Sequence, residues 1–410
     1  MASQAEKKRF RDGTHRAALP EDTLSRARPL LPVLGITRIA NVTGLDTIGL
    51  PVVMVCRPNA RSLSVAQGKG LSLAAAKASG VMESIETWHA ERILSPLKIA
   101  SARELRLTHR LAETAGLPRL SVSGFHEDRR LPWIEGTDLL SREAVWVPHE
   151  LVHMDYTRSL PGGGGSFLMT SSGLASGNHP LEALTHAVCE LVERDAFTLW
   201  RMAGEARQRR TRVDLTTVSD AACREVLGVY ERAGVEVSVW EITSDIGIPA
   251  FTAAIVDGSP NPQRPMGPMG GHGCHPDRGV ALLRALTEAA QSRLTIITGS
   301  RDDLSAGPAG TEGALEAARQ ALSRHHREPV VRAFHDAPTF ESDTLDGDLA
   351  WVTDRVRAAG IRQIVAVDLT RRELGIPVVR VVAPGLEPLL DLPGYHPGAR
   401  AQRQLREVNA

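Results

Sequence analysis

One long helical pattern begins just after Pro180 and continues without a break to Trp200. Proline suits the first turn of a helix, and the glycines that precede it predict a loop. At about 100° per residue, three glutamates of this stretch fall within about 80° of one another, whereas three apolar residues form a separate stripe. The acidic residues are Glu182, Glu190 and Glu193, and the stripe is Leu184, Val188 and Leu191. The pattern therefore predicts a helix with one acidic face.

Two further helical patterns place polar side chains on otherwise apolar helices. These side chains are Glu83 and Glu86 on a helix over 73–92, and Arg284, Glu288 and Gln291 on a helix over 276–298. Spacings of three and four residues bring such side chains onto one surface. A glutamate face is usually just the solvated side of a helix. Because the helix after Pro180 is apolar around most of its remaining circumference, we expect it to lie inside the molecule, with its acids lining a cleft.

The rest of the chain alternates between expected strands and helices. Strands are expected at 36–42, 50–57, 145–153, 235–243, 249–257, 329–334, 361–369 and 376–383, and helices at 20–31, 101–116, 311–325 and 348–358. Units of helix plus strand with an acidic helix recur, which indicates an α/β (α+β) fold built from related subdomains. The Gly-, Pro- and Met-rich stretch 260–273 predicts a mobile loop. The polar end, 392–410, predicts a loose tail.

Composition narrows the class of protein only a little. The 410 residues are 42% hydrophobic and 23% charged with a formal net charge of zero, so no bulk attraction to nucleic acid or membrane is implied. No stretch approaches the roughly 18 apolar residues of a membrane span, and no signal peptide is recognisable. We therefore expect a cytoplasmic protein with no nucleic-acid or membrane partner. Four scattered cysteines without a CxxC pair argue against a disulfide framework and a structural zinc site.

Clustered glutamates inside a molecule require compensation of their charge. Two carboxylates about 4 Å apart repel by roughly 4 kcal/mol at an effective dielectric near 20. Protons, arginines or metal cations can relieve this repulsion. Carboxylate oxygens suit Mg²⁺, which proteins typically hold with a few carboxylates, waters and substrate phosphates. The acids therefore indicate a magnesium–nucleotide site.

Other chemistries fit the sequence less well. The stretch Gly68-Lys-Gly70 lacks the first glycine and the hydroxyl residue of a Walker loop. A zinc site at His272, Cys274 and His275 lacks a distant pair of ligands. Paired glutamates could serve a glycoside hydrolase, but six Trp and three Tyr leave little surface for stacking sugars, and the acids outnumber the two that this reaction needs. No Gly-x-Ser-x-Gly elbow indicates a serine hydrolase.

Taken together, the motifs resemble those of the YcaO domain family over roughly residues 57–390. Each motif alone is weak, but their order along the chain matches the family's successive nucleotide-site motifs. They are Ser79-x3-Glu83-x2-Glu86, Asn178-x3-Glu182-x7-Glu190-x2-Glu193-Arg194, Glu288-x2-Gln291-x-Arg293 and Gly299-Ser-Arg301-Asp-Asp. The resemblance implies a YcaO fold, with mixed sheets and long helices around a non-Walker ATP site. It divides the chain into an N-terminal segment that closes on the core (1–56), a catalytic domain (57–390) and a polar tail (391–410).

The resemblance also implies ATP and Mg²⁺ as cofactors and the phosphorylation of a peptide amide oxygen. A nucleophile would then attack the amide carbon, and phosphate would leave. For such phosphoryl transfer the protein mainly supplies positioning and charge neutralisation. The implied magnesium ligands are Glu83, Glu86, Glu190 and Glu193. The implied ATP- or phosphate-binding residues are Arg16, Thr23, Ser79, Asn178, Glu182, Arg194, Gln291 and Arg293.

Two positions depart from the family's pattern. Thr87 stands where arginine often follows the acid at position 86, and Ser172 stands where asparagine often precedes the glycine at 173. These departures change local contacts without removing an acid.

The nucleophile depends on the subgroup. Azoline-forming members use a Cys, Ser or Thr side chain of the substrate and often end in Pro-x-Pro-x-Pro, which residues 403–410 lack. Segments 57–70 and 375–387 instead resemble the subgroup that works with a TfuA partner, in which a sulfide equivalent gives a backbone thioamide. We favour thioamide formation in a ribosomally made precursor peptide or protein, with a TfuA-like partner and a sulfur donor. Azoline formation is the first alternative and a non-catalytic ATP-binding scaffold the second; a homodimer is expected.

Overall fold

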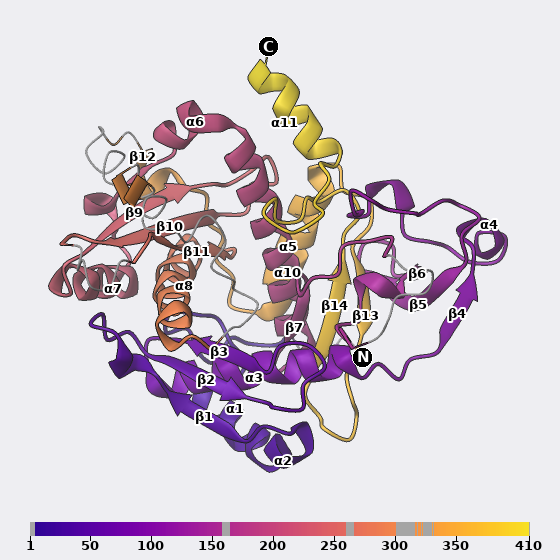
Figure 1. The fold of residues 1–410 in the computed structure, drawn as a ribbon, viewed down its shortest axis with the longest axis horizontal. Coiled ribbons are helices and arrows are strands. Elements are labelled where there is room, and N and C mark those ends of the chain that lie inside the picture. Colours follow the sequence, from indigo (N-terminus) through magenta and orange to yellow (C-terminus); the bar gives the residue numbers. More distant parts are fainter. Residues whose placement is uncertain are drawn as a thin grey trace.

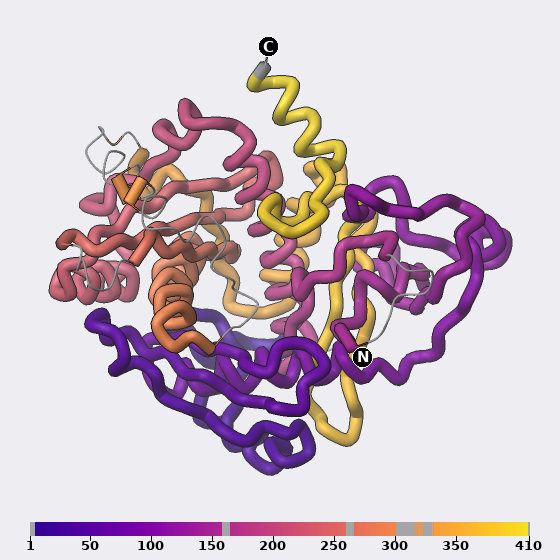
Figure 2. Tube along the Cα trace, viewed as in Figure 1, coloured from indigo at the N-terminus to yellow at the C-terminus, as the bar shows by residue number. Residues whose placement is uncertain are grey.

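In a computed structural model the chain forms a mixed α+β fold, in which long helices pack against antiparallel sheets (Figure 1). The structure describes residues 5–157, 165–259, 266–300, 316–317, 319–320, 322, 330 and 332–409. The fold class expected from the sequence is confirmed. Within these ranges, none of the helices has the length and apolar character of a membrane span. Figure 2 shows the N-terminal part of the chain, in indigo, along the lower edge of the molecule, with the C-terminal helix projecting at the top.

The first sheet–helix unit lies near the N-terminus. Its strands, in antiparallel order, are β1 (Arg38–Asn41), β2 (Val52–Cys56) and β3 (Val65–Lys69), and its helix is α3 (Leu73–Glu91). Strand β3 lies very close to α3. A Cβ added at Gly68 would lie 2.0 Å from the carbonyl oxygen of Ala76 and 2.2 Å from the amide nitrogen of Gly80. Only a residue without a side chain permits this approach.

The second sheet–helix unit repeats this arrangement. Its strands, in antiparallel order, are β11 (Met269–Cys274), β10 (Ala250–Asp257) and β9 (Val235–Glu241), and its helix is α8 (Arg278–Thr298). A Cβ at Gly271 would lie 2.2 Å from the carbonyl oxygen of Ala285, and one at Gly273 would lie 2.0 Å from that of Ala281. Glycines again allow a strand to lie directly against the neighbouring helix.

The expected mobile loop over 260–273 was therefore partly wrong. Its second half forms strand β11, paired with β10 along its whole length. Residues 260–265 lie outside the described part of the chain. Glycines predicted a loop because of their backbone freedom, but in β11 they serve close packing against α8.

A third, larger sheet supports the central helix. Its path runs β4 (Leu97–Ala100), β5 (Leu131–Asp138), β13 (Val365–Asp368), β14 (Val378–Val382) and β7 (Leu174–Ser176), with β6 (Ala144–Pro148) also paired to β5. The central helix, α5 (Pro180–Met202), runs unbroken past Trp200 as expected. Val188 and Val192 of α5 share an apolar cluster with Val381 of β14 and Val352 of α10 (Leu345–Ala358). Helix α5 thus lies inside the molecule.

The remaining elements are short. They are α1 (Pro20–Ala27), α2 (Leu31–Leu34), α4 (Ala102–Leu105), α6 (Gly204–Arg210), α7 (Ala221–Arg232), α11 (Ala399–Asn409), β8 (Val213–Asp214) and β12 (Arg332–Ala333). The helix expected at 101–116 is reduced to α4 and a 3₁₀ turn, and the strand expected at 145–153 ends at Pro148. Most of the helix expected at 311–325, and positions 301–303 of the last motif, lie outside the described residues.

The C-terminal tail was expected to be loose, and this was partly wrong, because Ala399–Asn409 forms helix α11 and its first turn is held by buried contacts. Arg400 at the start of α11 donates two hydrogen bonds to Asp195 of α5, at 2.8 and 2.9 Å, and pairs with Asp245. The carboxylate of Glu387 accepts the N–H of Ala401 at 2.9 Å. The polar composition predicted solvation, but Arg400 is buried against an acid that the central helix supplies.

Candidate metal and nucleotide site

Five glutamates from three helices gather where α3, α5 and α8 approach one another. They are Glu83 and Glu86 on α3, Glu190 and Glu193 on α5, and Glu288 on α8. The charges of Glu83 and Glu190 both raise the pKa of Glu86, and the charge of Glu288 raises the pKa of Glu193. The helices thus bring the predicted acids together, as their shared faces indicated.

Glu86 carries the most strongly raised pKa of the group. Burial raises its pKa to about 8, although the N–H and hydroxyl of Ser176 donate to its Oε1 at 2.8 and 2.7 Å. Repulsion from Glu83 and Glu190 adds to the effect of burial. Without a cation this carboxyl therefore holds a proton at neutral pH. A divalent ion could take the place of that proton, so the donor set fits magnesium.

Glu190 and Glu193 share one arginine. Arg194 Nη2 donates to Glu190 Oε1 at 3.2 Å, and its Nη1 lies 3.4 Å from Glu193 Oε1. The N–H of Gly173 donates to the other oxygen of Glu190 at 3.0 Å. Burial raises the pKa of Glu193 to about 7, against the lowering effect of Arg194. One guanidinium neutralises only one of two carboxylates, here the buried Glu193 and the partly buried Glu190, so the pair can accept a further positive charge.

Glu288 differs from the other acids because a lysine side chain pairs with it. Lys69, at the end of β3, lies 2.5 Å from Glu288 Oε2, and the N–H of His272 on β11 donates to Oε1 at 3.2 Å. Burial alone would raise the pKa of Glu288, but the charges of Lys69 and Arg194 lower it to about 2. Glu288 therefore stays ionised and bridges the two sheet–helix units.

Three buried nitrogen atoms at the site lack a hydrogen-bond partner within the part of the chain that the structure describes and could face an anion. Among the described residues, no hydrogen-bond partner meets the buried Nε atoms of Arg194 and Arg284 or Nδ1 of His272. Buried N–H groups usually have a partner, and guanidinium groups bind phosphate well. Carboxylates can bind the Mg²⁺ of a magnesium–ATP complex, and guanidinium groups beside them can bind its phosphates. The residues present therefore fit Mg²⁺ and ATP.

The N-terminal residues reach the start of α5. Arg16 Nη1 lies 3.1 Å from Glu182 Oε1, and the N–H of Ala17 donates to Oε2 at 3.0 Å. Thr23 Oγ1 donates to Asn178 Oδ1 at 3.1 Å. All four nucleotide-site residues expected at this end, Arg16, Thr23, Asn178 and Glu182, thus lie together.

The remaining residues expected to bind the nucleotide, Ser79, Gln291 and Arg293, differ in their contacts and exposure. Ser79 is exposed on α3, one turn before Glu83. Gln291 Nε2 donates to the backbone oxygen of Gln67 at 2.9 Å, which ties α8 to β3. Arg293 was expected to face phosphates, but its guanidinium pairs with Asp46 at 3.0 Å and Asp257 at 2.7 Å. The structure therefore does not bring Arg293 into the acid cluster.

The two departures from the family pattern have local partners. Thr87 Oγ1 accepts a hydrogen bond from Arg57 Nη2 at 3.0 Å, and Arg57 also pairs with buried Glu91. The N–H of Ser172 donates to Thr170 Oγ1 at 3.2 Å. Neither contact involves an acid of the cluster.

Sequence reasoning gave no role to Lys69 or Arg284 and quoted Glu288 only as part of a motif. The signal for Glu288 was its spacing from Arg284 and Gln291 on an otherwise apolar helix. Lys69 stands in the Gly68-Lys-Gly70 stretch, which fits no Walker loop. It meets Glu288 only through the packing of β3 beside α8.

Comparisons with known sequences agree with this site. Residues 67–387 match the family model for YcaO cyclodehydratases, which is described as binding ATP and Mg²⁺. A protein encoded in the tfuA 3′ region of Rhizobium leguminosarum bv. trifolii is 39% identical over 402 residues, covering 96% of this chain and 92% of that protein. An uncharacterized protein of Methanothermobacter thermautotrophicus is 34% identical over 380 residues, covering 90% of this chain and 94% of the other.

Solved structures share the fold. A heterocyclase in complex with substrate and cofactor superposes with a TM-score of 0.76 at 24% identity and is matched by 95% of this chain. This chain spans about half, 54%, of that longer protein. YcaO from Methanopyrus kandleri, bound with AMPPCP and Mg²⁺, has a TM-score of 0.73 at 23% identity, with 93% of this chain and 95% of that one covered.

The fold and the family model together define a class of proteins described as binding ATP and Mg²⁺. The chain belongs to the YcaO family. ATP and Mg²⁺, the cofactors expected from the sequence, are those of the family.

Proposed function

We propose that this chain is an ATP- and Mg²⁺-dependent enzyme that activates a peptide backbone amide and, with a TfuA-like partner, converts it to a thioamide. The convergence of the acids of α3 and α5 supports the ATP-dependent step. The 39% identical relative from a tfuA region supports the sulfur chemistry. A precursor peptide or protein, a sulfur donor, a homodimeric state and a cytoplasmic location belong to the same proposal.

The proposed reaction exchanges an amide oxygen for sulfur. The oxygen takes up the terminal phosphoryl group, a sulfide equivalent adds to the carbon, and the oxygen departs as phosphate while the C=S bond forms. Bound Mg²⁺ would supply neutralisation of the triphosphate charge. The protein would contribute orientation, because phosphoryl transfer depends mainly on positioning and charge.

The residues have distinct proposed roles. The magnesium ligands would be Glu83, Glu86, Glu190 and Glu193. The nucleotide would contact Arg16, Thr23, Ser79, Asn178, Glu182, Arg194 and Gln291. Arg293 would support α8 instead, because Asp46 and Asp257 already neutralise it. Lys69 would keep Glu288 ionised beside the phosphates.

Azoline formation is the second candidate. The family model is described as a cyclodehydratase, and a heterocyclase shares the fold. In that reaction a Cys, Ser or Thr side chain of the substrate would attack the activated carbon, and the product would have lost water. A binding scaffold without catalysis is disfavoured, because all the helical acids are retained.

One experiment tests the function and its alternative together. Purified enzyme, partner, ATP, sulfide and precursor peptide should give the mass gain of exchanging oxygen for sulfur, measured by mass spectrometry. Glu190→Gln or Glu193→Gln should abolish peptide-dependent ADP release while circular dichroism stays unchanged. Glu205→Gln, at an exposed glutamate of α6 paired with Arg209, is the matched control and should retain activity. Loss of water would select azoline formation, and normal turnover in both site variants would refute the metal role.

A further inference from the structure

The N-terminal residues fold into a hairpin before they reach α5. In this N-terminal hairpin, residues 9–17, the N–H groups of Arg9 and Phe10 donate to the carbonyl of Arg16 at 2.9 and 3.1 Å. The N–H of Arg16 returns to the carbonyl of Phe10 at 2.9 Å. Gly13 turns the chain with φ +67° and lies against Leu283 of α8. The hairpin leads directly into the contacts of Arg16 and Ala17 with Glu182.

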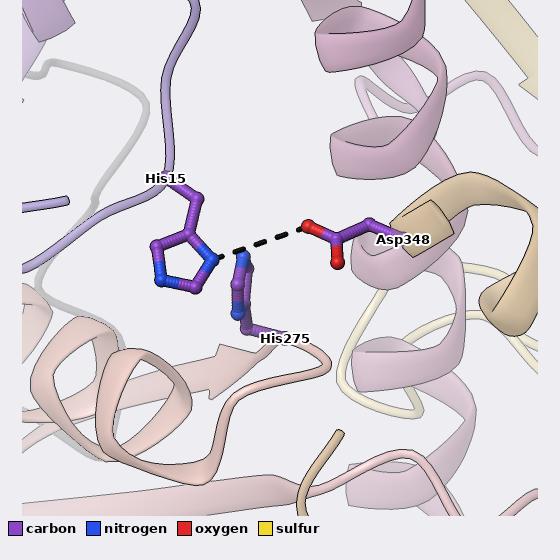
Figure 3. A group of neighbouring side chains, drawn as sticks. All are labelled: His15, His275 and Asp348. Carbon is purple, nitrogen blue, oxygen red and sulfur yellow. Dashed lines mark ion pairs between the residues drawn. The ribbon is translucent and has the colours of Figure 1, made fainter. Parts of the chain in front are cut away.

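A buried ion pair anchors this hairpin to α10. Lys8 Nζ lies 2.8 and 2.7 Å from the two carboxylate oxygens of Asp348, and 3.1 Å from His15 Nδ1. The Lys8 side chain is 0% exposed and that of Asp348 is 2% exposed. Figure 3 shows His15 of the hairpin, His275 and Asp348 facing one another. Removing one partner from such a pair leaves the other charge buried and uncompensated.

His15, His275 and Asp348 also have the donor types of a metal site, with ligand atoms within 4.8 Å of one another. Their hydrogen bonds argue against metal. An ammonium can only donate, so His15 Nδ1 accepts from Lys8, and the N–H of Asp277 donates to His275 Nδ1 at 3.0 Å. Nδ1 of each ring thus already has a hydrogen-bond partner in the protein, which a metal ion would have to displace at that nitrogen. Lys8 already supplies the positive charge at Asp348.

The anchor is continuous with the nucleotide end of the site. A cavity of about 20 Å³ is lined by residues of both groups, among them His15, His275, Asp348, Arg16, Glu182 and Arg284. A shift of Lys8 would therefore move Arg16 and Ala17 relative to Glu182. A displacement of a binding group by about 1 Å can lower the rate of a reaction by about 100-fold.

We propose that Lys8 and Asp348 are positioning residues for the nucleotide, which act by fixing the N-terminal hairpin so that Arg16 and Ala17 hold Glu182. This inference rests on the proposed ATP site. It assigns no contact with ATP to either residue.

The chain offers a matched control pair on the same segment. Arg11 and Asp343 lie 2.7 Å apart, but their side chains are 49% and 88% exposed. Exposed pairs of this kind contribute little. Arg11→Ala should therefore leave the hairpin in place.

The first measurement is calorimetric titration with Mg²⁺ and a non-hydrolysable ATP analogue. Asp348→Asn and Lys8→Met should weaken nucleotide binding by about tenfold or more. Lys8→Arg keeps the charge and should fall between Lys8→Met and the wild type, while Arg11→Ala should match the wild type. If the wild type binds and both anchor variants bind equally well, the inference fails. If the wild type does not bind, the proposed function fails.

The second measurement needs no nucleotide. Hydrogen exchange at the amide of Ala17, which donates to Glu182 at 3.0 Å, should speed up in Asp348→Asn and stay unchanged in Arg11→Ala. Faster exchange confined to residues 9–17, with α5 and α8 still protected, supports positioning. Exchange at Ala17 equal to that of the wild type would overturn the inference.

Discussion

The β1–β3 unit with α3 and the β9–β11 unit with α8 share one architecture, but the pKa of a glutamate is raised in the first unit and lowered in the second. In both, a strand that contains glycine lies against the helix that carries the acids (Figure 1). In the first unit, burial and neighbouring acids raise the pKa of Glu86 to about 8. In the second, Lys69 and Arg194 overcome burial and lower the pKa of Glu288 to about 2. Backbone packing thus fixes where the acids stand, and nearby cations decide which of them needs a metal ion.

The largest expected effect tests the shared architecture. Gly68→Ala and Gly271→Ala would each place a Cβ about 2 Å from a backbone oxygen of the adjacent helix. Because neither backbone atom can move cheaply, each substitution should lower the free energy of unfolding by about 3 kcal/mol. Denaturant titration would measure this. Gly44→Ala, with no heavy atom within 4 Å of the added Cβ, is the control and should be near neutral. Equal stability of all three variants would contradict the close packing.

The next largest effect is expected on Mg²⁺ affinity, which should depend more on the acid of α3 than on the acid of α8. Glu86→Gln should weaken Mg²⁺ binding by about 100-fold, because it removes a proposed ligand. Glu288→Gln should cost about tenfold or less, since Glu288 is neutralised by Lys69. Titration of Mg²⁺ in the presence of a non-hydrolysable nucleotide gives both values. The reverse order would place the metal on the α8 side.

A smaller effect concerns the pH dependence of stability in metal-free protein. The pKa of Glu86 is raised in the folded state, so its contribution to stability is lost as pH rises from about 5 through 8. The pKa of Glu288 is lowered, so its contribution is present above about 4.5 and is lost as pH falls towards 2. Thermal melts in EDTA should therefore show Glu86→Gln flattening the decline between about pH 4.5 and 8, the ordinary and the raised pKa of this carboxyl. Glu288→Gln should flatten only the acid limb. If Glu86→Gln leaves the melting temperature unchanged relative to wild type across the upper range, the raised pKa is wrong.

The sequence predicted the three long helices α3, α5 and α8 and their polar faces well. A helical period of 3.6 residues is a local property, so Glu83, Glu86, Glu190 and Glu193 could be placed on shared faces before any packing was known. The ordered motifs then identified the family. The resemblance also named Arg16, Thr23, Asn178 and Glu182 as nucleotide-site residues, and the fold brings these four residues together.

What the sequence could not predict depends on contacts between distant segments. Strand β11 looked like a loop, because the need for glycine arises only when α8 lies against it. The tail looked loose because the partner of Arg400 is Asp195, far away in the chain. Arg293 fits a phosphate-binding motif, yet Asp46 and Asp257 reach it in the fold. Pairing of charges across elements is thus the information that local patterns lack.

The most direct test is a crystal structure with Mn²⁺ and a non-hydrolysable ATP analogue, with anomalous scattering used to locate the metal. The account predicts manganese between α3 and α5, within about 2.2 Å of carboxylate oxygens of Glu86 and Glu190. Manganese bound elsewhere, with those side chains still hydrogen-bonded to Ser176 and Arg194, would contradict it.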